Sequence, residues 1–150
     1  MPVCEGSAAA AAIGTAAAVR AAADESLSAG VHCWEMEITK GEAMVGVCKA
    51  DVRPESGTND LHSQQGKAWV MHAFDGSLYP GGKDKAGRVP EGARLGCKLD
   101  LGAGTLTFYL NGVKHGPGWT GIVGPVKRCV EIGERGDSVR LVRTEPAFRD

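Results

Sequence analysis

Residues 95–112 constrain the fold of this chain more than any other stretch, because they predict a β-hairpin followed by a second tight turn. Successive side chains of a strand point to opposite faces, so one face of each alternating run is expected to be buried. Gly102 and Gly104 predict the loop between the two runs, and Asn111 with Gly112 is typical of a two-residue hairpin turn. The residues expected on the buried faces are Leu95, Cys97, Leu99, Leu106, Phe108 and Leu110.

Other parts of the chain repeat this alternation and predict further strands. These strands cover residues 34–39, 44–48, 68–74, 129–132 and 139–142. Stretches rich in glycine and proline predict long loops at 51–67, 80–92 and 116–125. Short strands without a convincing amphipathic helix predict an all-β sandwich. The aromatic residues expected in its core are Trp34, Trp69, Phe74 and Phe108.

Size and composition fit one self-sufficient domain. The chain has 150 residues, of which 43% are hydrophobic, enough to build a core without a metal or disulfide staple. A net charge of −1 argues against nonspecific nucleic-acid binding, which needs a basic surface. No apolar run is long enough to span a membrane, and the absence of a basic region ahead of the alanine-rich N-terminal run argues against a secretory signal. The five cysteines are odd in number and widely spaced, which predicts buried reduced thiols and a cytoplasmic protein.

The N-terminal segment is ambiguous by pattern alone. Of the 16 residues from Ala8 to Ala23, 11 are alanine, which by propensity favours helix. Gly14, Thr15 and Val19 weaken that interpretation, and the segment has no amphipathic stripe. Residue preferences therefore leave both helix and strand open here.

Several motifs, taken in order, resemble those of a SPRY domain. They lie at residues 30–38, 45–47, 68–69, 76–79, 95–100, 104–112, 124–126 and 139–141. The resemblance covers about residues 28–143 and implies a curved antiparallel β-sandwich of the concanavalin-like jelly-roll type, with little or no helix. It also implies that residues 12–23 form strand despite their alanine content. The expected organisation is a flexible segment at 1–11, one domain at 12–143 and a polar tail at 144–150.

SPRY domains are protein-interaction modules without catalytic activity of their own. The resemblance therefore implies a non-enzymatic module that binds a short segment of a partner protein through loops at one end of the sandwich. We expect a protein or peptide partner, with no nucleic acid, membrane or small-molecule substrate. The chain is expected to be a monomer unless it belongs to a larger assembly. A structural subunit of such an assembly and a lectin-like carbohydrate-binding sandwich are the alternatives.

The resemblance also places the expected partner site. In adaptor-type SPRY domains, part of the peptide pocket follows the Val-Gly-Val motif, and here Lys49, Asp51 and Arg53 occupy that stretch. A second part is a Val-Trp-Gly motif, where this sequence has Val130, Glu131 and Ile132 instead. Trp119 lies in a loop rich in glycine and proline, so it is expected either to anchor a partner or to cap the edge of the sandwich. The predicted partner-binding residues are Lys49, Asp51, Arg53, Trp119, Val130 and Glu131.

The sequence predicts no catalytic residue, metal site or cofactor. Residues 116–121 match the Gly-x-Gly-x-x-Gly pattern, but the following Ile-Val-Gly-Pro cannot begin the helix that a dinucleotide site requires. His32 and Cys33 are neighbours on a predicted strand, so their side chains point to opposite faces and cannot form a catalytic pair. No spacing of cysteines or histidines is typical of zinc.

Overall fold

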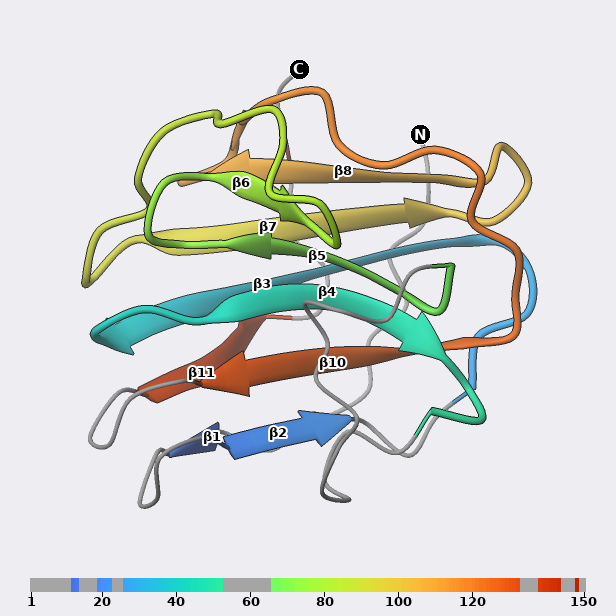
Figure 1. The fold of residues 1–150 in the computed structure, drawn as a ribbon, viewed down its shortest axis with the longest axis horizontal. Helices are drawn as coiled ribbons and strands as arrows, with labels where there is room; N and C mark the ends of the chain where they lie inside the picture. Colours follow the sequence, from blue (N-terminus) through green and yellow to red (C-terminus); the bar gives the residue numbers. More distant parts are fainter. Residues whose placement is uncertain are drawn as a thin grey trace.

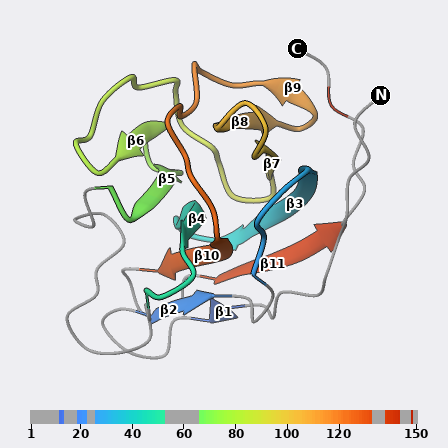
Figure 2. The same ribbon diagram turned by 90° about the vertical axis from the view of Figure 1, so that its right-hand side faces the viewer.

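The computed structural model describes residues 12–13, 19–22, 26–52, 66–132, 138–143 and Phe148, and within these ranges it contains two antiparallel sheets and no helix. One sheet has six strands in the order β1-β11-β3-β7-β8-β9, and the other has five in the order β2-β10-β4-β5-β6. Figure 1 shows the strands along the chain, and Figure 2 shows the sheets as two facing, curved layers. The prediction of a curved, all-β antiparallel sandwich is confirmed.

The six-stranded sheet is built from both ends of the chain and its middle. Its strands are β1 (Ala12–Ile13), β3 (Val31–Lys40), β7 (Arg94–Asp100), β8 (Thr105–Leu110), β9 (Val113–Lys114) and β11 (Ser138–Arg143). The five-stranded sheet contains β2 (Val19–Ala22), β4 (Met44–Lys49), β5 (Ala68–His72), β6 (Ser77–Tyr79) and β10 (Val126–Ile132). Among the described residues, no helix is long and apolar enough to cross a membrane.

The hairpin predicted at 95–112 forms with the expected faces. In the register of β7 with β8, Leu95 lies opposite Leu110 and Cys97 opposite Phe108. At the following turn Asn111 has φ 49° and Gly112 has φ 88°, the pair of positive values that a type I′ turn requires. The Asn111 side chain also accepts a hydrogen bond from the Arg94 backbone NH at 2.8 Å, which ties the turn to the start of β7.

The core lies between the two sheets. Trp34, Met36 and Ile38 project into it from β3, and Val45 and Val47 project from β4. Trp69 and Phe108 also lie in this core, as the alternating pattern predicts. Burying one such side chain contributes about 1.5–3 kcal/mol relative to leaving it in water, which makes this layer the main source of stability.

Phe74 is the exception, and the prediction that it lies in the core is wrong. The strand β5 ends at His72, and the Phe74 side chain is 52% exposed. Its ring lies 6.0 Å from the His72 ring and 5.6 Å from the Arg88 guanidinium. The apolar run in the sequence continues past the end of β5. Because alternation between the two faces applies only within a strand, it does not place Phe74 in the core.

The N-terminal alanines form strand where the structure describes them. Val19 to Ala22 pair with Ile132 to Cys129 of β10, and Ala12 and Ile13 pair with β11. Edge pairing with long strands therefore overrides the helix preference of alanine. The expected flexible segment at 1–11 lies outside the described residues, as does most of the expected tail at 144–150.

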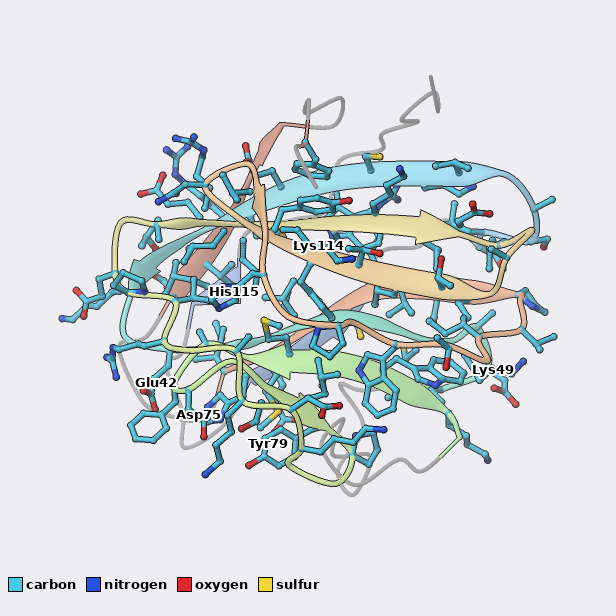
Figure 3. All side chains as sticks on the ribbon, turned by 90° about the horizontal axis from the view of Figure 1, so that it is seen from above. Glu42, Lys49, Asp75, Tyr79, Lys114 and His115 are labelled. Atoms are coloured by element: carbon cyan, nitrogen blue, oxygen red, sulfur yellow. The ribbon has the colours of Figure 1, made fainter. Side chains whose placement is uncertain are left out.

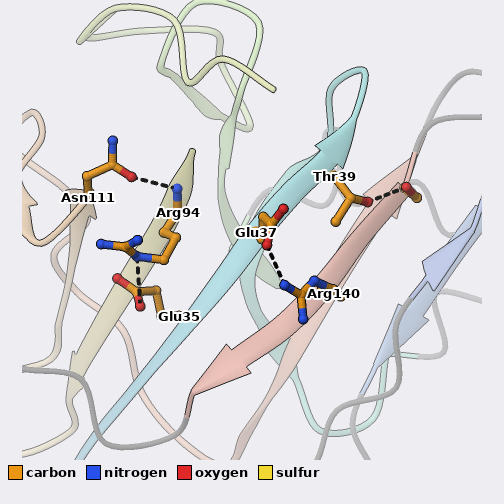
Figure 4. Close-up of polar contacts among 7 residues, drawn as sticks. Glu35, Glu37, Thr39, Arg94, Asn111 and Arg140 are labelled. Carbon is orange, nitrogen blue, oxygen red and sulfur yellow. Dashed lines mark hydrogen bonds and ion pairs between the residues drawn. The ribbon is translucent and has the colours of Figure 1, made fainter. Parts of the chain in front are cut away.

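The strand β11, which lies between β1 and β3, is fastened to β3 by side chains on the outer face of the six-stranded sheet. Arg140 donates to Glu37 Oε1 at 2.7 Å, and the hydroxyls of Thr39 and Ser138 are hydrogen-bonded (Figure 4). These contacts reinforce a pairing whose register shifts between Ser138 and Val139.

The described cysteines divide into two groups. Cys48, Cys97 and Cys129 are buried thiols that form no disulfide, as predicted for structural thiols. Burial raises the pKa of Cys97 and of Cys129, so both thiols stay protonated and unreactive at neutral pH. Cys33 departs from the prediction of reduced thiols, because it takes part in a disulfide.

Candidate functional site

A pocket of about 430 Å³ lies where β4 ends and where the chain approaches β10. It is lined by Lys49, Ala50, Asp51 and Pro125. The backbone NH of Ala50 donates to Pro125 O at 3.0 Å, and the NH of Val52 donates to Lys49 O at 3.0 Å. These bonds fix both walls of the pocket. In Figure 3, Lys49 lies at the opposite end of the sandwich from Glu42 and Asp75.

The Lys49 side chain is held at the pocket by a specific contact. Its Nζ donates to Val123 O at 2.8 Å, so the ammonium group bridges the end of β4 and the loop before β10. The Val123 side chain beside this contact is 68% exposed, an unusual position for a large apolar residue. Asp51, which also lines the pocket, is exposed. The site therefore combines a positioned cation, a carboxylate and apolar surface.

The two predicted residues on β10 do not join this pocket. Val130 is 4% exposed and packs in the core between the sheets. Glu131 is 7% exposed and pairs with Met44 at the start of β4, whereas Lys49 pairs with Val126. Five residues of strand separate Glu131 from Val126, roughly 17 Å at about 3.3 Å per residue. The structure thus brings Lys49 and Asp51 together and keeps Val130 and Glu131 away from them.

Trp119 links the two sheets at their open edge. Its backbone forms a bridge with Leu106 of β8, and its indole Nε1 donates to Val70 O of β5 at 3.2 Å. The Lys83 ammonium lies 4.6 Å from the centre of the ring. This geometry is that of an edge cap, the second of the two roles expected for the residue. Its role as a partner contact stays a prediction.

Arg53, the remaining predicted residue, lies outside the described residues. Sequence reasoning did not select Pro125 or Val123, which come from the loop before β10. Both residues lie in or beside the irregular stretch 116–125, whose glycines and prolines predict a loop. The sequence does not indicate that this loop lies next to Lys49. Their proximity to Lys49 results from the pairing of β4 with β10.

Two chemical patterns, a metal-ligand cluster and the Gly-x-Gly-x-x-Gly motif, can be checked in the part of the chain that the structure describes. Among the described residues, no group of three or more His, Cys, Asp or Glu side chains is placed to hold a metal ion. Residues 116–121 form an irregular loop with positive φ at Gly116, Gly118 and Gly121 and one bridge at Trp119, and no helix follows them before β10. The pattern therefore lacks the helix N-terminus that binds a pyrophosphate.

Comparison with known proteins agrees with this architecture. The family model of the SPRY domain matches residues 31–137. The SPRY domain of human HERC1 superposes with a TM-score of 0.71 at 21% identity, covering 91% of this chain and 87% of that one. A second human SPRY domain superposes with a TM-score of 0.65 at 18% identity, covering 83% of each chain. At these identities the solved structures establish the fold.

Because the family model matches well over half of its length, this chain belongs to the SPRY domain family. SPRY domains are in general protein-interaction modules without catalytic activity.

Proposed function

We propose that this SPRY domain binds a short segment of a partner protein in the pocket formed by Lys49, Ala50, Asp51 and Pro125, and that it catalyses no reaction. The observation that carries the proposal is the position of this pocket directly after the Val-Gly-Val motif of β4. The peptide pocket of adaptor-type SPRY domains includes the same stretch. A volume of about 430 Å³ fits one or two side chains of a peptide.

The chemistry of the pocket favours a segment that carries an apolar residue beside an acidic one. Ala50 and Pro125 offer apolar walls, and the exposed Val123 extends them. An ammonium group has three donors, of which Lys49 uses one on Val123 O, so a carboxylate of the partner can accept another. Arg53 follows closely in the sequence and would add a second cation. The distant and buried Glu131 does not oppose an acidic ligand at this place. The Asp51 carboxylate on the same pocket repels an acidic group, so the acidic residue of the partner is expected to approach at Lys49.

A charge reversal tests the proposal. In affinity capture from native lysate, the double variant Lys49→Glu with Arg53→Glu should recover at least tenfold less of each partner that the wild type captures. The matched control is Lys85→Glu with Lys114→Glu, which makes the same change of net charge at exposed positions away from the pocket. The control should capture as the wild type does, and all three proteins should melt at nearly the same temperature. Equal capture by the double variant would show that the partner binds elsewhere.

A second variant tests the pocket without changing charge. Ala50→Leu places a larger side chain in the space between Lys49 and Pro125, so it should weaken capture while leaving the fold intact. If Ala50→Leu binds normally and the charge reversal does not, the partner contacts the rim of the pocket rather than its interior.

Carbohydrate binding is the competing class, and the geometry of Trp119 does not favour it. A sugar site needs an open aromatic face, whereas the Trp119 indole is bonded to Val70 O and the Lys83 ammonium lies over its ring. A glycan array with a clear signal would nevertheless reverse this preference.

A further inference from the structure

An aromatic residue from the end of the chain lies on the outer face of the six-stranded sheet. The Phe148 ring stacks on the Tyr109 ring with centroids 4.1 Å apart and an interplanar angle of 9°. Phe108, the neighbour of Tyr109 on β8, points into the core, so Tyr109 points to the outside of the sandwich. Tyr109 is nevertheless only 1% exposed. The outer face is therefore covered at this point.

The space for the Phe148 ring exists because residue 96 has no side chain. A Cβ atom on Gly96 would lie 2.4 Å from Phe148 Cε1 and 2.5 Å from Phe148 Cζ. The same Cβ would lie 3.3 Å from Tyr109 Cβ, its cross-strand neighbour. Gly96 thus forms the floor and Tyr109 the wall of a slot that the Phe148 ring occupies. Any other residue at position 96 would close it.

The neighbouring strand supplies a charged rim. Glu35 of β3 lies directly opposite Gly96 in the sheet, and its carboxylate is 3.3 Å from the Nε of Arg94 (Figure 4). The Glu35 side chain is 4% exposed, whereas that of Arg94 is 45% exposed. The slot therefore borders a buried carboxylate and a half-exposed guanidinium, a suitable setting for the backbone and polar neighbours of an inserted aromatic residue.

We propose that Gly96 and Tyr109 form a binding slot for an aromatic side chain of a peptide. Phe148 of the same chain fills this slot and thereby closes it to other peptides. The loop pocket at Lys49 belongs to the other sheet, so this site is independent of the function proposed above. A residue tethered in the same chain acts at an effective concentration in the millimolar range. The slot therefore accepts a peptide in trans only when Phe148 is released or when the partner binds tightly enough to displace it.

The variant Phe148→Ala of the 150-residue chain tests the proposal, because it removes the ring from the slot and leaves the residues of the sheet unchanged. The probe is a synthetic peptide with the sequence of residues 143–150, titrated to about 5 mM and followed by amide chemical shifts in NMR. The amides of Gly96 and Tyr109 should shift and saturate in Phe148→Ala. In the wild type they should respond at least tenfold more weakly, because Phe148 already occupies the site.

Two controls separate stacking in the slot from general adhesion. A peptide with alanine in place of its phenylalanine should cause no shift at Gly96, and one with cyclohexylalanine, which is apolar but not planar, should bind several-fold more weakly. Gly96→Ala combined with Phe148→Ala should lose the response to the parent peptide. If that double variant fails to fold, the three peptides titrated into Phe148→Ala still test whether an aromatic ring is required. Absence of saturable shifts in Phe148→Ala, or equal shifts with the alanine peptide, would overturn the proposal whether or not the Lys49 pocket binds its partner.

Discussion

The guanidinium of Arg128 lies over the ring of Trp34, with its Cζ 5.0 Å from the ring centroid, in the interior between the two sheets. Arg128 is 1% exposed and Trp34 is not exposed at all, so a cation from β10 and an indole from β3 join the sheets where water is excluded. A cation over an aromatic face contributes about 2 kcal/mol or more when it is desolvated. This pair is therefore a link between the layers rather than an incidental contact.

Replacing this cation tests its planar geometry. Arg128→Lys keeps the charge but loses the flat guanidinium group that lies over the Trp34 ring, so the free energy of unfolding should fall by about 1–3 kcal/mol. Urea denaturation followed by tryptophan fluorescence measures the change. A loss below about 0.5 kcal/mol would mean that charge alone, and not stacking, is what the site requires.

Two phenylalanines form a matched pair for the core. Phe108 is completely buried, so Phe108→Ala should cost about 3–5 kcal/mol as a large-to-small change. Phe74 is 52% exposed, so Phe74→Ala should change stability by no more than about 0.5 kcal/mol. Thermal and chemical denaturation of both variants provide the comparison. Similar losses of stability in the two variants would contradict the assignment of Phe108 to the core and of Phe74 to the surface.

Close approach of two strands makes Gly46 irreplaceable. A Cβ at this position would lie 2.0 Å from Trp69 O and 2.8 Å from Val70 Cα, both backbone atoms of β5 that cannot rotate away. Gly46→Ala should therefore destabilise the domain by more than about 2 kcal/mol, through displacement of β4 from β5. Gly102→Ala is the control, because its Cβ would meet only Asp100 Oδ1 at 3.3 Å, and it should be nearly neutral in the same denaturation experiment.

The buried thiols predict a loss of stability in alkaline solution. Burial raises the pKa of Cys97 and of Cys129 in the folded state, whereas an exposed thiol in the unfolded chain titrates near about 8.5. The folded protein therefore holds more protons above that pH, and its stability should be constant below the unfolded pKa and fall as the pH rises past it. Urea denaturation midpoints measured at pH values below and above the pKa of the exposed thiol test the predicted fall in stability. The double variant Cys97→Ala with Cys129→Ala should show a shallower decline, and an unchanged slope would assign the effect to other groups.

Local sequence predicted those features that depend on neighbours along the chain. The two positive φ values at Asn111 and Gly112 and the inward faces of β7 and β8 follow from turn chemistry and from alternation, which need no distant partner. Phe74 shows where this reasoning ends, because it lies two residues past the end of β5 and is no longer governed by the alternation of that strand. The alanine-rich segment shows the opposite case, since its propensity favoured helix but its strands form against β10 and β11.

The candidate site divides in the same way. Lys49 and Asp51 were predicted from a motif next to them in sequence, and the structure does place them on one pocket. Pro125 and Val123 joined that pocket only through the pairing of strands far apart in the chain. Val130 and Glu131 lie elsewhere because register and burial, which a motif does not contain, place them along β10.

The order of residues alone therefore determined the class of fold, its tight turns and its alternating buried faces, because these arise from interactions between residues close in sequence. The tertiary structure decided which residues meet across the sheets, including Lys49 with Val123, Arg128 with Trp34 and Phe148 with Tyr109. Such pairs depend on strand register and on the packing of one layer against the other. Those quantities are set only when the whole chain has folded.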